Sequence, residues 1–323
     1  MIPYSWLEEA AERIAPYIHK TPLTYDPNND LYLKWENHQI TGSFKARGAL
    51  NKVLSLDDWE QERGLVAASA GNHGQGVALA GQIVHAKAVI FVSEHAVPSK
   101  VAAMKKYGAE IHFVVGGYGE AEKAGLEYAA DHGATWISPY NDGQVIAGQG
   151  TLGLELLQAL PGVTESAWLV PVGGGGLISG LGAAIDAYYP DQYDGGKSHS
   201  KPDLIAVQSE ASPFFHSIYH TGSQSSVREL PSLADGLSGP VEANAVTISI
   251  VKRWVDKFIL VSEEDIKQAI IYAWKRYHEM IEGSAAAALA AVLTNKITTR
   301  PSVIILSGGN IQPELHAQLT DNN

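Results

Sequence analysis

The sequence contains no cysteine, which excludes disulfide bonds and metal sites built on thiolates. It also lacks any apolar run approaching the roughly 20 residues that a membrane-spanning helix requires. The segment from Met1 to Glu12 has no apolar stretch behind basic residues, so it does not resemble a secretory signal. We therefore expect a cytoplasmic protein with no membrane partner.

Positive charge is also scarce, with 23 Lys and Arg residues against 35 Asp and Glu and a net charge of −12. A nucleic-acid surface needs clustered Lys and Arg, so we expect no nucleic-acid partner. Hydrophobic residues make up 45% of the chain, as in an ordinary folded core. Glycine is in excess, at 32 of 323 residues. Such an excess indicates tight turns or backbone that lies close to a ligand.

Short β-rich runs alternate with helical stretches through most of the chain. The expected strands are 65–69, 88–92, 110–115, 135–138, 167–172, 203–208, 258–261 and 302–307, after a first strand at 31–36. One expected helix follows the loop at 70–73 and ends at residue 83. The others span 97–107, 119–132, 150–160, 177–188, 263–279 and 283–293. Residues 189–201 are rich in Asp, Gly and Ser and predict a surface loop. This alternation predicts an α/β fold in which parallel sheets carry helices on their faces.

The first candidate motif is Thr41-Gly42-Ser43-Phe44-Lys45, which follows an expected strand. A lysine at the start of a helix meets the positive end of the helix dipole, and this favours the neutral amine that a Schiff base requires. Taken alone, an exposed surface lysine is the simpler interpretation.

The second motif, Ser69-Ala70-Gly71-Asn72-His73-Gly74, lies at a strand-to-helix junction. Small residues with free N–H groups at a helix start can bind an anion such as an amino-acid carboxylate. Asn72 could bond a phenolic oxygen on a ring, whereas a histidine such as His73 is more often structural than catalytic.

Two further glycine motifs follow expected strands. Gly173 to Gly176 precede a helix, so their N–H groups can converge on a phosphate. A dinucleotide site is the rival interpretation, but its third glycine would fall at Ser179. Ser307-Gly308-Gly309-Asn310 follows the last strand, where ligands of open parallel sheets bind and where a hydroxyl could meet a ring nitrogen.

Together these motifs resemble those of fold-type II pyridoxal-phosphate enzymes, in the branch of threonine/serine dehydratases (ammonia-lyases) and serine racemases. The resemblance covers the chain from Arg13 to Asn310. The matching segments, in family order, are Thr21–Leu23, Lys34–Asn37, Gly42–Ala49, Ser69–Gln75, Ala147–Thr151, Gly173–Gly176 and Ser307–Asn310. The chain is similar to the short form, without a regulatory domain. The resemblance implies a two-lobed, tryptophan synthase beta-like fold with a small domain at 54–140 inserted into a large domain of 1–53 and 141–323.

The resemblance also implies a role for each motif. Lys45 would form the Schiff base with pyridoxal 5'-phosphate and act as the catalytic residue. The other implied cofactor-binding residues are Phe44, Asn72, Gly173, Gly174, Gly175, Gly176, Leu177, Glu282 and Ser307. The substrate carboxylate would be bound by Ser69, Gly71, Asn72 and His73. For Glu282, a helix-cap role is an equally good interpretation.

The resemblance and its departures favour elimination. A neutral hydroxyl at Ser307 leaves the ring nitrogen mostly unprotonated, which suits the expulsion of a β-hydroxyl better than a long-lived carbanion. Serine racemases have a second serine where this chain has Ala70, so two-base racemisation lacks its second acid. Many relatives bind a divalent cation where this chain has Gln208, Ser212 and Phe214, although Glu210 is nearby, so we expect no metal.

We therefore predict a pyridoxal-phosphate enzyme that removes ammonia from a small hydroxy amino acid, L-threonine or L-serine, as a homodimer or larger homo-oligomer. A serine racemase and a 3-hydroxyaspartate ammonia-lyase are the alternatives within the family. A non-catalytic ligand-binding relative and an NAD-dependent oxidoreductase are the alternatives outside it.

Overall fold

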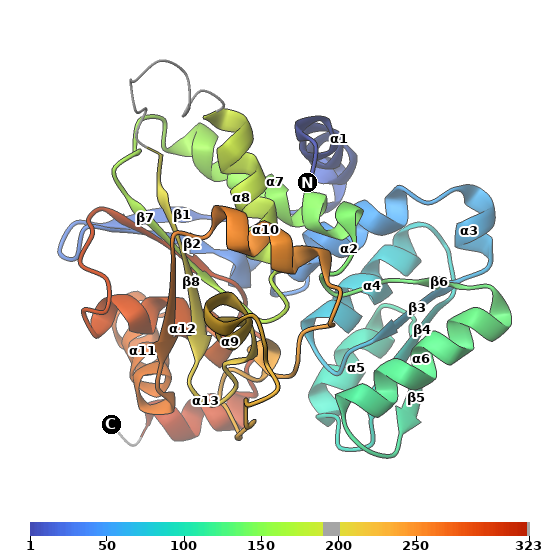
Figure 1. Ribbon diagram of the computed structural model, residues 1–323. Coiled ribbons are helices and arrows are strands. Elements are labelled where there is room, and N and C mark those ends of the chain that lie inside the picture. Colours follow the sequence, from blue (N-terminus) through green and yellow to red (C-terminus); the bar gives the residue numbers. More distant parts are fainter. Residues whose placement is uncertain (190–200, 322–323) are drawn as a thin grey trace.

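Two separate sheets organise the chain, and a computed structural model describes residues 1–189 and 201–321 of it. The larger sheet has the strand order β1-β2-β10-β7-β8-β9, and the smaller has the order β5-β4-β3-β6. Strand β1 is antiparallel to β2, and every other pair is parallel. Figure 1 shows the larger sheet on the left and the smaller on the right. The strands are β1 Leu23–Asp26, β2 Leu31–Trp35, β3 Leu65–Ala68, β4 Ala88–Ser93, β5 Glu110–Val114, β6 Thr135–Trp136, β7 Ala167–Pro171, β8 Asp203–Ser209, β9 Lys257–Val261 and β10 Ser302–Leu306.

Helices cover both faces of each sheet, which confirms the predicted α/β class. They are α1 Tyr4–Ile14, α2 Lys45–Leu54, α3 Asp58–Glu62, α4 Asn72–Ile83, α5 Pro98–Lys106, α6 Tyr118–His132, α7 Gly143–Ala159, α8 Gly176–Tyr188, α9 Phe214–Thr221, α10 Val246–Trp254, α11 Glu263–Tyr277, α12 Gly283–Leu293 and α13 Pro313–Thr320. Short 3₁₀ helices in the described residues are η1 Ala15–Tyr17, η2 Glu36–His38 and η3 Asp235–Leu237.

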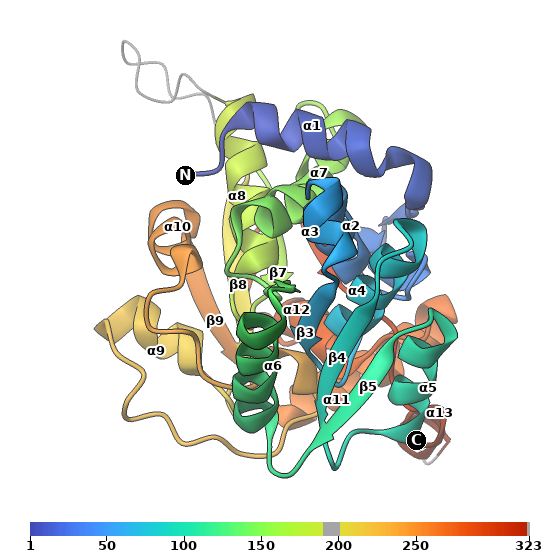
Figure 2. The same ribbon diagram turned by 90° about the vertical axis from the view of Figure 1, so that its right-hand side faces the viewer.

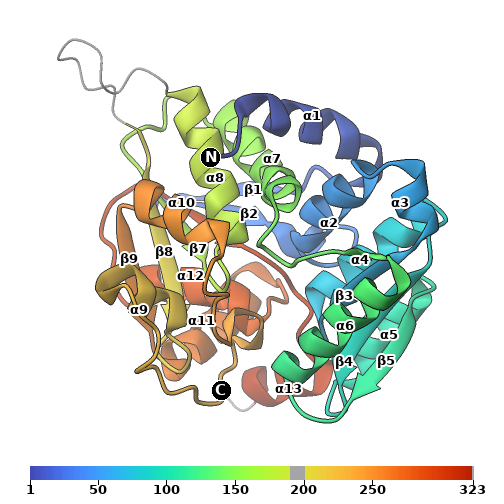
Figure 3. The ribbon, with the colours of Figure 1, turned by 45° about the vertical axis from the view of Figure 1, so that its right-hand side comes forward.

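Successive side chains along a strand point to opposite faces of its sheet, so the hydrophobic core lies in layers on the two faces. In β10, Val303 and Ile305 join the core on the face covered by α1, α7, α8 and α10, while Ile304 and Leu306 join the core under α11 and α12. The smaller sheet carries α2, α4 and α5 on one face and α6 on the other. Figure 2 shows α1 lying across α7, and Figure 3 shows α2 and α4 where the two lobes meet.

The predicted strands and most predicted helices agree with the structure to within a few residues. Helix α7 differs, because it begins at Gly143 rather than after Gly150. The Asp142 side chain accepts hydrogen bonds from the N–H groups of Gln144 and Val145 and so starts the helix earlier. The glycines in this helix serve close helix packing: a Cβ on Gly150 would lie 2.9 Å from the Gly180 carbonyl oxygen of α8.

Helix α2 packs against the smaller sheet, which concerns the predicted boundary between the large and small domains. Its apolar residues, including Ala46 and Leu50, pack into the core beneath the smaller sheet, although we assigned residues 1–53 to the large domain. The domain boundaries therefore stay a prediction. Below, the small lobe means the four-stranded sheet with α3 to α6, and the large lobe means the six-stranded sheet with its helices. Within the described residues, no helix has the length and apolarity needed to span a bilayer. The predicted loop at 189–201 lies almost wholly outside them.

Candidate active site

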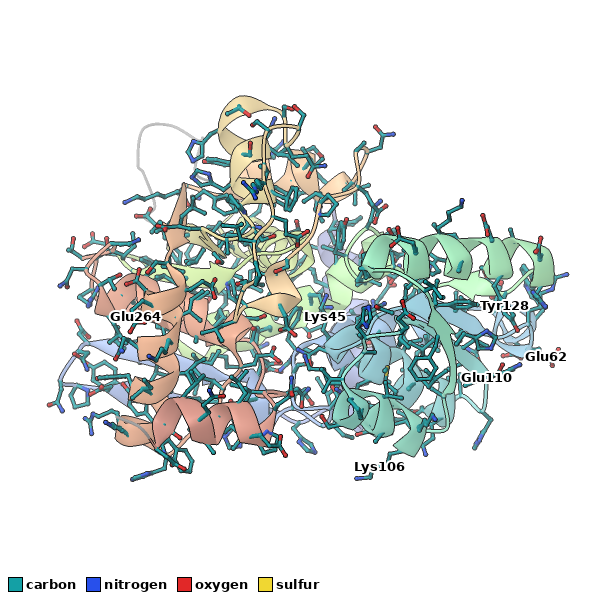
Figure 4. All side chains as sticks on the ribbon, turned by 90° about the horizontal axis from the view of Figure 1, so that it is seen from below. Lys45, Glu62, Lys106, Glu110, Tyr128 and Glu264 are labelled. Carbon is teal, nitrogen blue, oxygen red and sulfur yellow. The ribbon has the colours of Figure 1, made fainter. Side chains whose placement is uncertain are left out.

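All four sequence motifs follow the carboxyl ends of parallel strands. Residues 41–45 come after β2 and η2, residues 69–74 after β3, residues 173–176 after β7 and residues 307–310 after β10. In parallel sheets such ends meet at one edge, where ligands bind. Figure 4 shows Lys45 between the two lobes.

The first and last motifs are joined by backbone hydrogen bonds. The Phe44 N–H donates to the Ser307 carbonyl at 3.0 Å, and the Gly309 N–H donates to the Gly42 carbonyl at 2.9 Å. Gly42 has φ 72°, and a Cβ there would lie 2.6 Å from Oδ1 of Asn310. This position therefore requires glycine, and the two motifs form one unit.

Lys45 is the first residue of α2, as predicted. Its Nζ donates a hydrogen bond to the Pro139 carbonyl at 3.0 Å and lies 5.2 Å from the centre of the Phe44 ring. Burial lowers the pKa of the Lys45 amine to about 8, while the charge of Glu282 acts in the opposite direction. The main cause is thus loss of water around the cation, rather than the helix dipole that the sequence suggested. At neutral to mildly alkaline pH, Lys45 keeps a sizeable neutral fraction.

The second motif forms the amino terminus of α4. Gly71 precedes the helix, and its N–H donates to Oγ of Ser69 at 3.1 Å. The N–H groups of Asn72 and His73 are in the first turn, where a helix offers no acceptor of its own, so they are free to bind an anion.

The imidazole of His73 has a structural partner. It is buried, and its Nε2–H donates to the Ile137 carbonyl at 2.8 Å. Burial, followed by the charge of Lys45, lowers its pKa to about 3, so the ring stays neutral. The side chain of His73 is therefore neutral and is held in place through Nε2, while its backbone N–H can bind a substrate.

Three polar side chains link the lobes beside Lys45. Asn72 donates from Nδ2 to Oε1 of Glu282 at 2.7 Å, and Asn310 donates to Oδ1 of Asn72 at 2.7 Å. Burial, followed by the charge of Asp235, raises the pKa of Glu282 to about 7. The structure thus brings Glu282 into the same cluster as the second and fourth motifs.

The glycine loop, Gly173 to Gly176, leaves no room for side chains. A Cβ on Gly174 would lie 2.2 Å from the Tyr140 ring, and one on Gly173 would lie 3.1 Å from the Leu237 Cα. Gly175 has φ 86°, which glycine adopts without strain. Gly176 and Leu177 then begin α8, so their N–H groups also lack helical acceptors. This loop of bare backbone at a helix start fits a phosphate group.

Several hydroxyl groups nearby have no partner in the described part of the chain. Ser307 is only 2% exposed. The buried Oγ1 atom of Thr41 and the buried Oγ atoms of Ser43 and Ser284 make no hydrogen bond to the described residues. Buried polar groups are normally satisfied, so these hydroxyls indicate a polar ligand. Together with the glycine loop, they fit a cofactor that carries a phosphate and a polar ring.

A buried ion-pair network anchors the helix that carries Lys45. Arg47 is fully buried, donates from Nε and Nη2 to both carboxylate oxygens of Glu36 at 2.8 and 2.9 Å, and bonds Glu155 at 2.7 Å. Glu155 also pairs with the buried Lys34 at 2.7 Å. The start of α2 is therefore bonded directly to η2 and α7, and through Glu155 to Lys34 of β2.

Sequence reasoning missed several site residues. Pro139 and Tyr140 contact Lys45 and Gly174, and the η3 segment, with Gly236 and Leu237, contacts Gly173. These residues lie in loops, where no periodic pattern marks a contact. A turn-forming Asp235-Gly236 pair was the only signal for η3.

Gln208 and Ser212, two of the positions where the family resemblance places a possible cation, are bonded to backbone N–H groups. Gln208 Oε1 accepts a hydrogen bond from the His216 N–H at 3.0 Å, and Ser212 Oγ accepts one from the Gly239 N–H at 3.1 Å. Phe214 is buried in the core of the large lobe. Across residues 1–189 and 201–321, no group of three or more His, Asp or Glu side chains could hold a metal ion.

Comparisons with known proteins agree with this geometry. Residues 10–308 match the family described as pyridoxal-phosphate dependent enzyme. The L-threonine ammonia-lyase of Thermotoga maritima is 39% identical over 319 residues, which cover 96% of this chain and 76% of that protein. The catabolic L-threonine dehydratase of Staphylococcus aureus is 37% identical over 317 residues, which cover 94% and 88%. The structure of maize serine racemase superposes with a TM-score of 0.88 at 31% identity and covers 97% of this chain and 95% of that one.

The profile match extends over nearly the whole chain, and the relatives exceed 30% identity over most of their own length. Lys45, the glycine loop and the unpartnered hydroxyls supply what such a cofactor needs. The chain belongs to the family of pyridoxal-phosphate dependent enzymes.

Proposed function

We propose that this protein is a pyridoxal-phosphate dependent L-threonine/L-serine ammonia-lyase, which converts its substrate to a 2-oxo acid and ammonia. The observation that carries the proposal is Lys45, an amine with a pKa of about 8 placed among the helix amino termini of α4 and α8. Relatives named L-threonine ammonia-lyase and L-threonine dehydratase support this choice of reaction.

The residues that would hold the cofactor come from all four motifs. Lys45 would bind its aldehyde through Nζ, and Gly173 to Gly176 with Leu177 would bind its phosphate. Phe44 and Asn72 would flank the ring, and the Ser307 hydroxyl would meet its nitrogen. When bound, the cofactor supplies an electron-withdrawing ring that stabilises negative charge at the α-carbon.

The chain's own residues would then bind the substrate and move its protons. The free N–H groups at the start of α4, with Ser69 and Gly71, bind the carboxylate and fix the substrate's orientation. With the substrate amine on the cofactor in its place, the neutral Nζ of Lys45 would accept the α-proton and, as the ammonium, would donate a proton to the departing β-hydroxyl, which would leave as water. Hydrolysis of the enamine product would then consume one water molecule and give the 2-oxo acid and ammonia.

The motifs contribute no cation dedicated to a second substrate carboxylate, which favours threonine and serine over 3-hydroxyaspartate. Serine racemase is the second candidate, because solved serine racemases from maize and Dictyostelium discoideum superpose well on this chain. Ala70 argues against it, since a methyl group has no proton to deliver to the opposite face of the α-carbon. We further propose a cytoplasmic homo-oligomer, on the cysteine-free composition and the family resemblance.

The test is release of 2-oxo acid from L-threonine and L-serine by purified protein loaded with pyridoxal phosphate. Lys45→Ala should abolish release, while Lys106→Ala, an exposed lysine at the end of α5, should leave it unchanged. Absence of 2-oxo acid with both amino acids would reject the lyase assignment. D-Serine formed faster than pyruvate would favour the racemase.

A further inference from the structure

An ion pair crosses from the small lobe to the segment that lines the site. Lys100, in the first turn of α5, donates from Nζ to Oδ2 of Asp235 at 2.7 Å. The Lys100 side chain is 16% exposed and that of Asp235 is 61% exposed, so the cation is mostly buried while the carboxylate is largely exposed to solvent. None of the four sequence motifs includes either residue.

Asp235 begins η3, and η3 is wedged between two parts of the site. A Cβ on Gly173 would lie 3.3 Å from the Gly236 carbonyl oxygen, and a Cβ on Gly236 would lie 2.8 Å from Oγ of Ser284. The segment that Lys100 contacts is therefore packed between the glycine loop and the start of α12. A displacement of Asp235 would therefore move residues that contact the glycine loop and the start of α12.

The same ion pair flanks Glu282. The negative charge of Asp235 raises the pKa of the Glu282 carboxyl, and the positive charge of Lys100 lowers it. Glu282 in turn accepts a hydrogen bond from Asn72, which is the first residue of α4 in the small lobe. Thus α4 and α5, neighbouring helices of the small lobe, are each bonded to the large lobe beside Lys45.

We propose that Lys100 is a positioning residue, which through its ion pair with Asp235 joins the small lobe to η3 and holds the two lobes together around Lys45 and its ligands. The inference rests on the proposed function only for its kinetic consequence. Holding the lobes together keeps water from the reacting atoms and keeps the carboxylate-binding turn of α4 close to the glycine loop. Without this ion pair, part of the ligand's binding free energy must be used to close the lobes.

Two variants break the ion pair in ways that can be told apart. Lys100→Met and Asp235→Asn both remove the ion pair. The first removes a positive charge near Glu282 and the second a negative charge, so they shift the pKa of Glu282 in opposite directions. If lobe closure is what matters, both should raise the KM for L-serine about fivefold with kcat changed less than twofold. That change corresponds to about 1 kcal/mol, at about 1.4 kcal/mol per tenfold. The exchanged pair Lys100→Asp with Asp235→Lys should recover most of the lost affinity.

The second measurement does not depend on turnover. Amide hydrogen exchange in α5 of the cofactor-loaded protein should become about fivefold faster in Lys100→Met and in Asp235→Asn, and the Kd for pyridoxal phosphate should rise by a similar factor. Lys106→Met, at the exposed end of the same helix (Figure 4), is the matched control and should behave as wild type.

Opposite changes in the two variants, unchanged exchange in α5, or no recovery in the exchanged pair would overturn the proposal. The exchange and Kd results stand even if the wild type releases no 2-oxo acid. The outcome for the ion pair is therefore separate from the outcome for the lyase assignment.

Discussion

Glu282→Gln should make the cofactor-free protein more stable, and increasingly so as the pH rises. Glu282 is 6% exposed, and burial raises its pKa from 4.5 to about 7. A carboxyl with a raised pKa binds its proton more tightly in the folded state. Stability is therefore lost as the pH rises from about 4.5 to about 7 and is level above that range. Glutamine keeps an oxygen that can accept the Asn72 hydrogen bond but never becomes charged.

The size of the effect follows from the two pKa values. Between pH 5 and pH 8, the free energy of unfolding of the wild type should fall by about 2.5 kcal/mol relative to Glu282→Gln. With an unfolding entropy of about 2.1 cal/mol/K per residue, this separates the two melting temperatures by about 4 °C more at pH 8 than at pH 5. Groups on which Glu282 does not act, such as His73 with its lowered pKa, titrate alike in both proteins and cancel in the difference, whereas Lys45, whose pKa the charge of Glu282 raises, contributes to it.

The assay is thermal unfolding of both cofactor-free proteins, followed by circular dichroism or calorimetry at half-unit steps from pH 5 to pH 8. Melting temperatures that run parallel across this range would refute the reasoning. They would mean that Glu282 has an ordinary pKa, and hence that its surroundings are wetter than the structure indicates.

Three further substitutions test other parts of the site. Gly174→Ala should weaken pyridoxal phosphate binding about tenfold in a cofactor titration, because its Cβ would lie 2.2 Å from the Tyr140 ring. Arg47→Met should lower the free energy of unfolding by about 3–5 kcal/mol in a denaturant titration, since it leaves the buried carboxylate of Glu36 without its partner. Ala70→Ser should increase the ratio of D-serine to pyruvate formed from L-serine in a chiral assay, because it adds an exchangeable proton.

Each of these has a control or a contrary result. Gly119→Ala, at a position with open space around the added Cβ, should leave cofactor affinity unchanged. A stable Arg47→Met protein would show that the network does not hold α2. An unchanged product ratio in Ala70→Ser would show that the α-carbon faces elsewhere.

The site could be predicted in large part because parallel strands place their carboxyl ends together. Lys45, Asn72, Gly174 and Ser307 each follow such an end, so a correct list of strands was enough to gather them. Contacts between loops carry no such rule. Nothing in the sequence connects Lys45 with Pro139, or Lys100 with Asp235, and only the folded chain shows these pairs.

The prediction of the fold was least accurate in two places. One is a strand whose buried and exposed residues do not alternate, and the other is a helix in which glycine permits close packing. The edge strand β1 was missed, since its two middle residues are both exposed and leave no pattern. The start of α7 was placed too late because glycine was taken as a sign of turns or ligand contact. In this helix it permits contact with the backbone of α8. The low pKa of Lys45 was expected, but its cause, burial, depends on residues far along the chain.

The position of β10 has a consequence for biosynthesis. This strand, the last in the sequence, lies between β2 and β7, and it also delivers the backbone that bonds the loop before Lys45. The pair of strands β1 and β2 therefore cannot join the rest of its sheet until residues 302–306 have been synthesised and have left the ribosome. The small lobe, whose sheet is contiguous in sequence, can form before β10 is made, whereas cofactor capture must wait for residues 302–310.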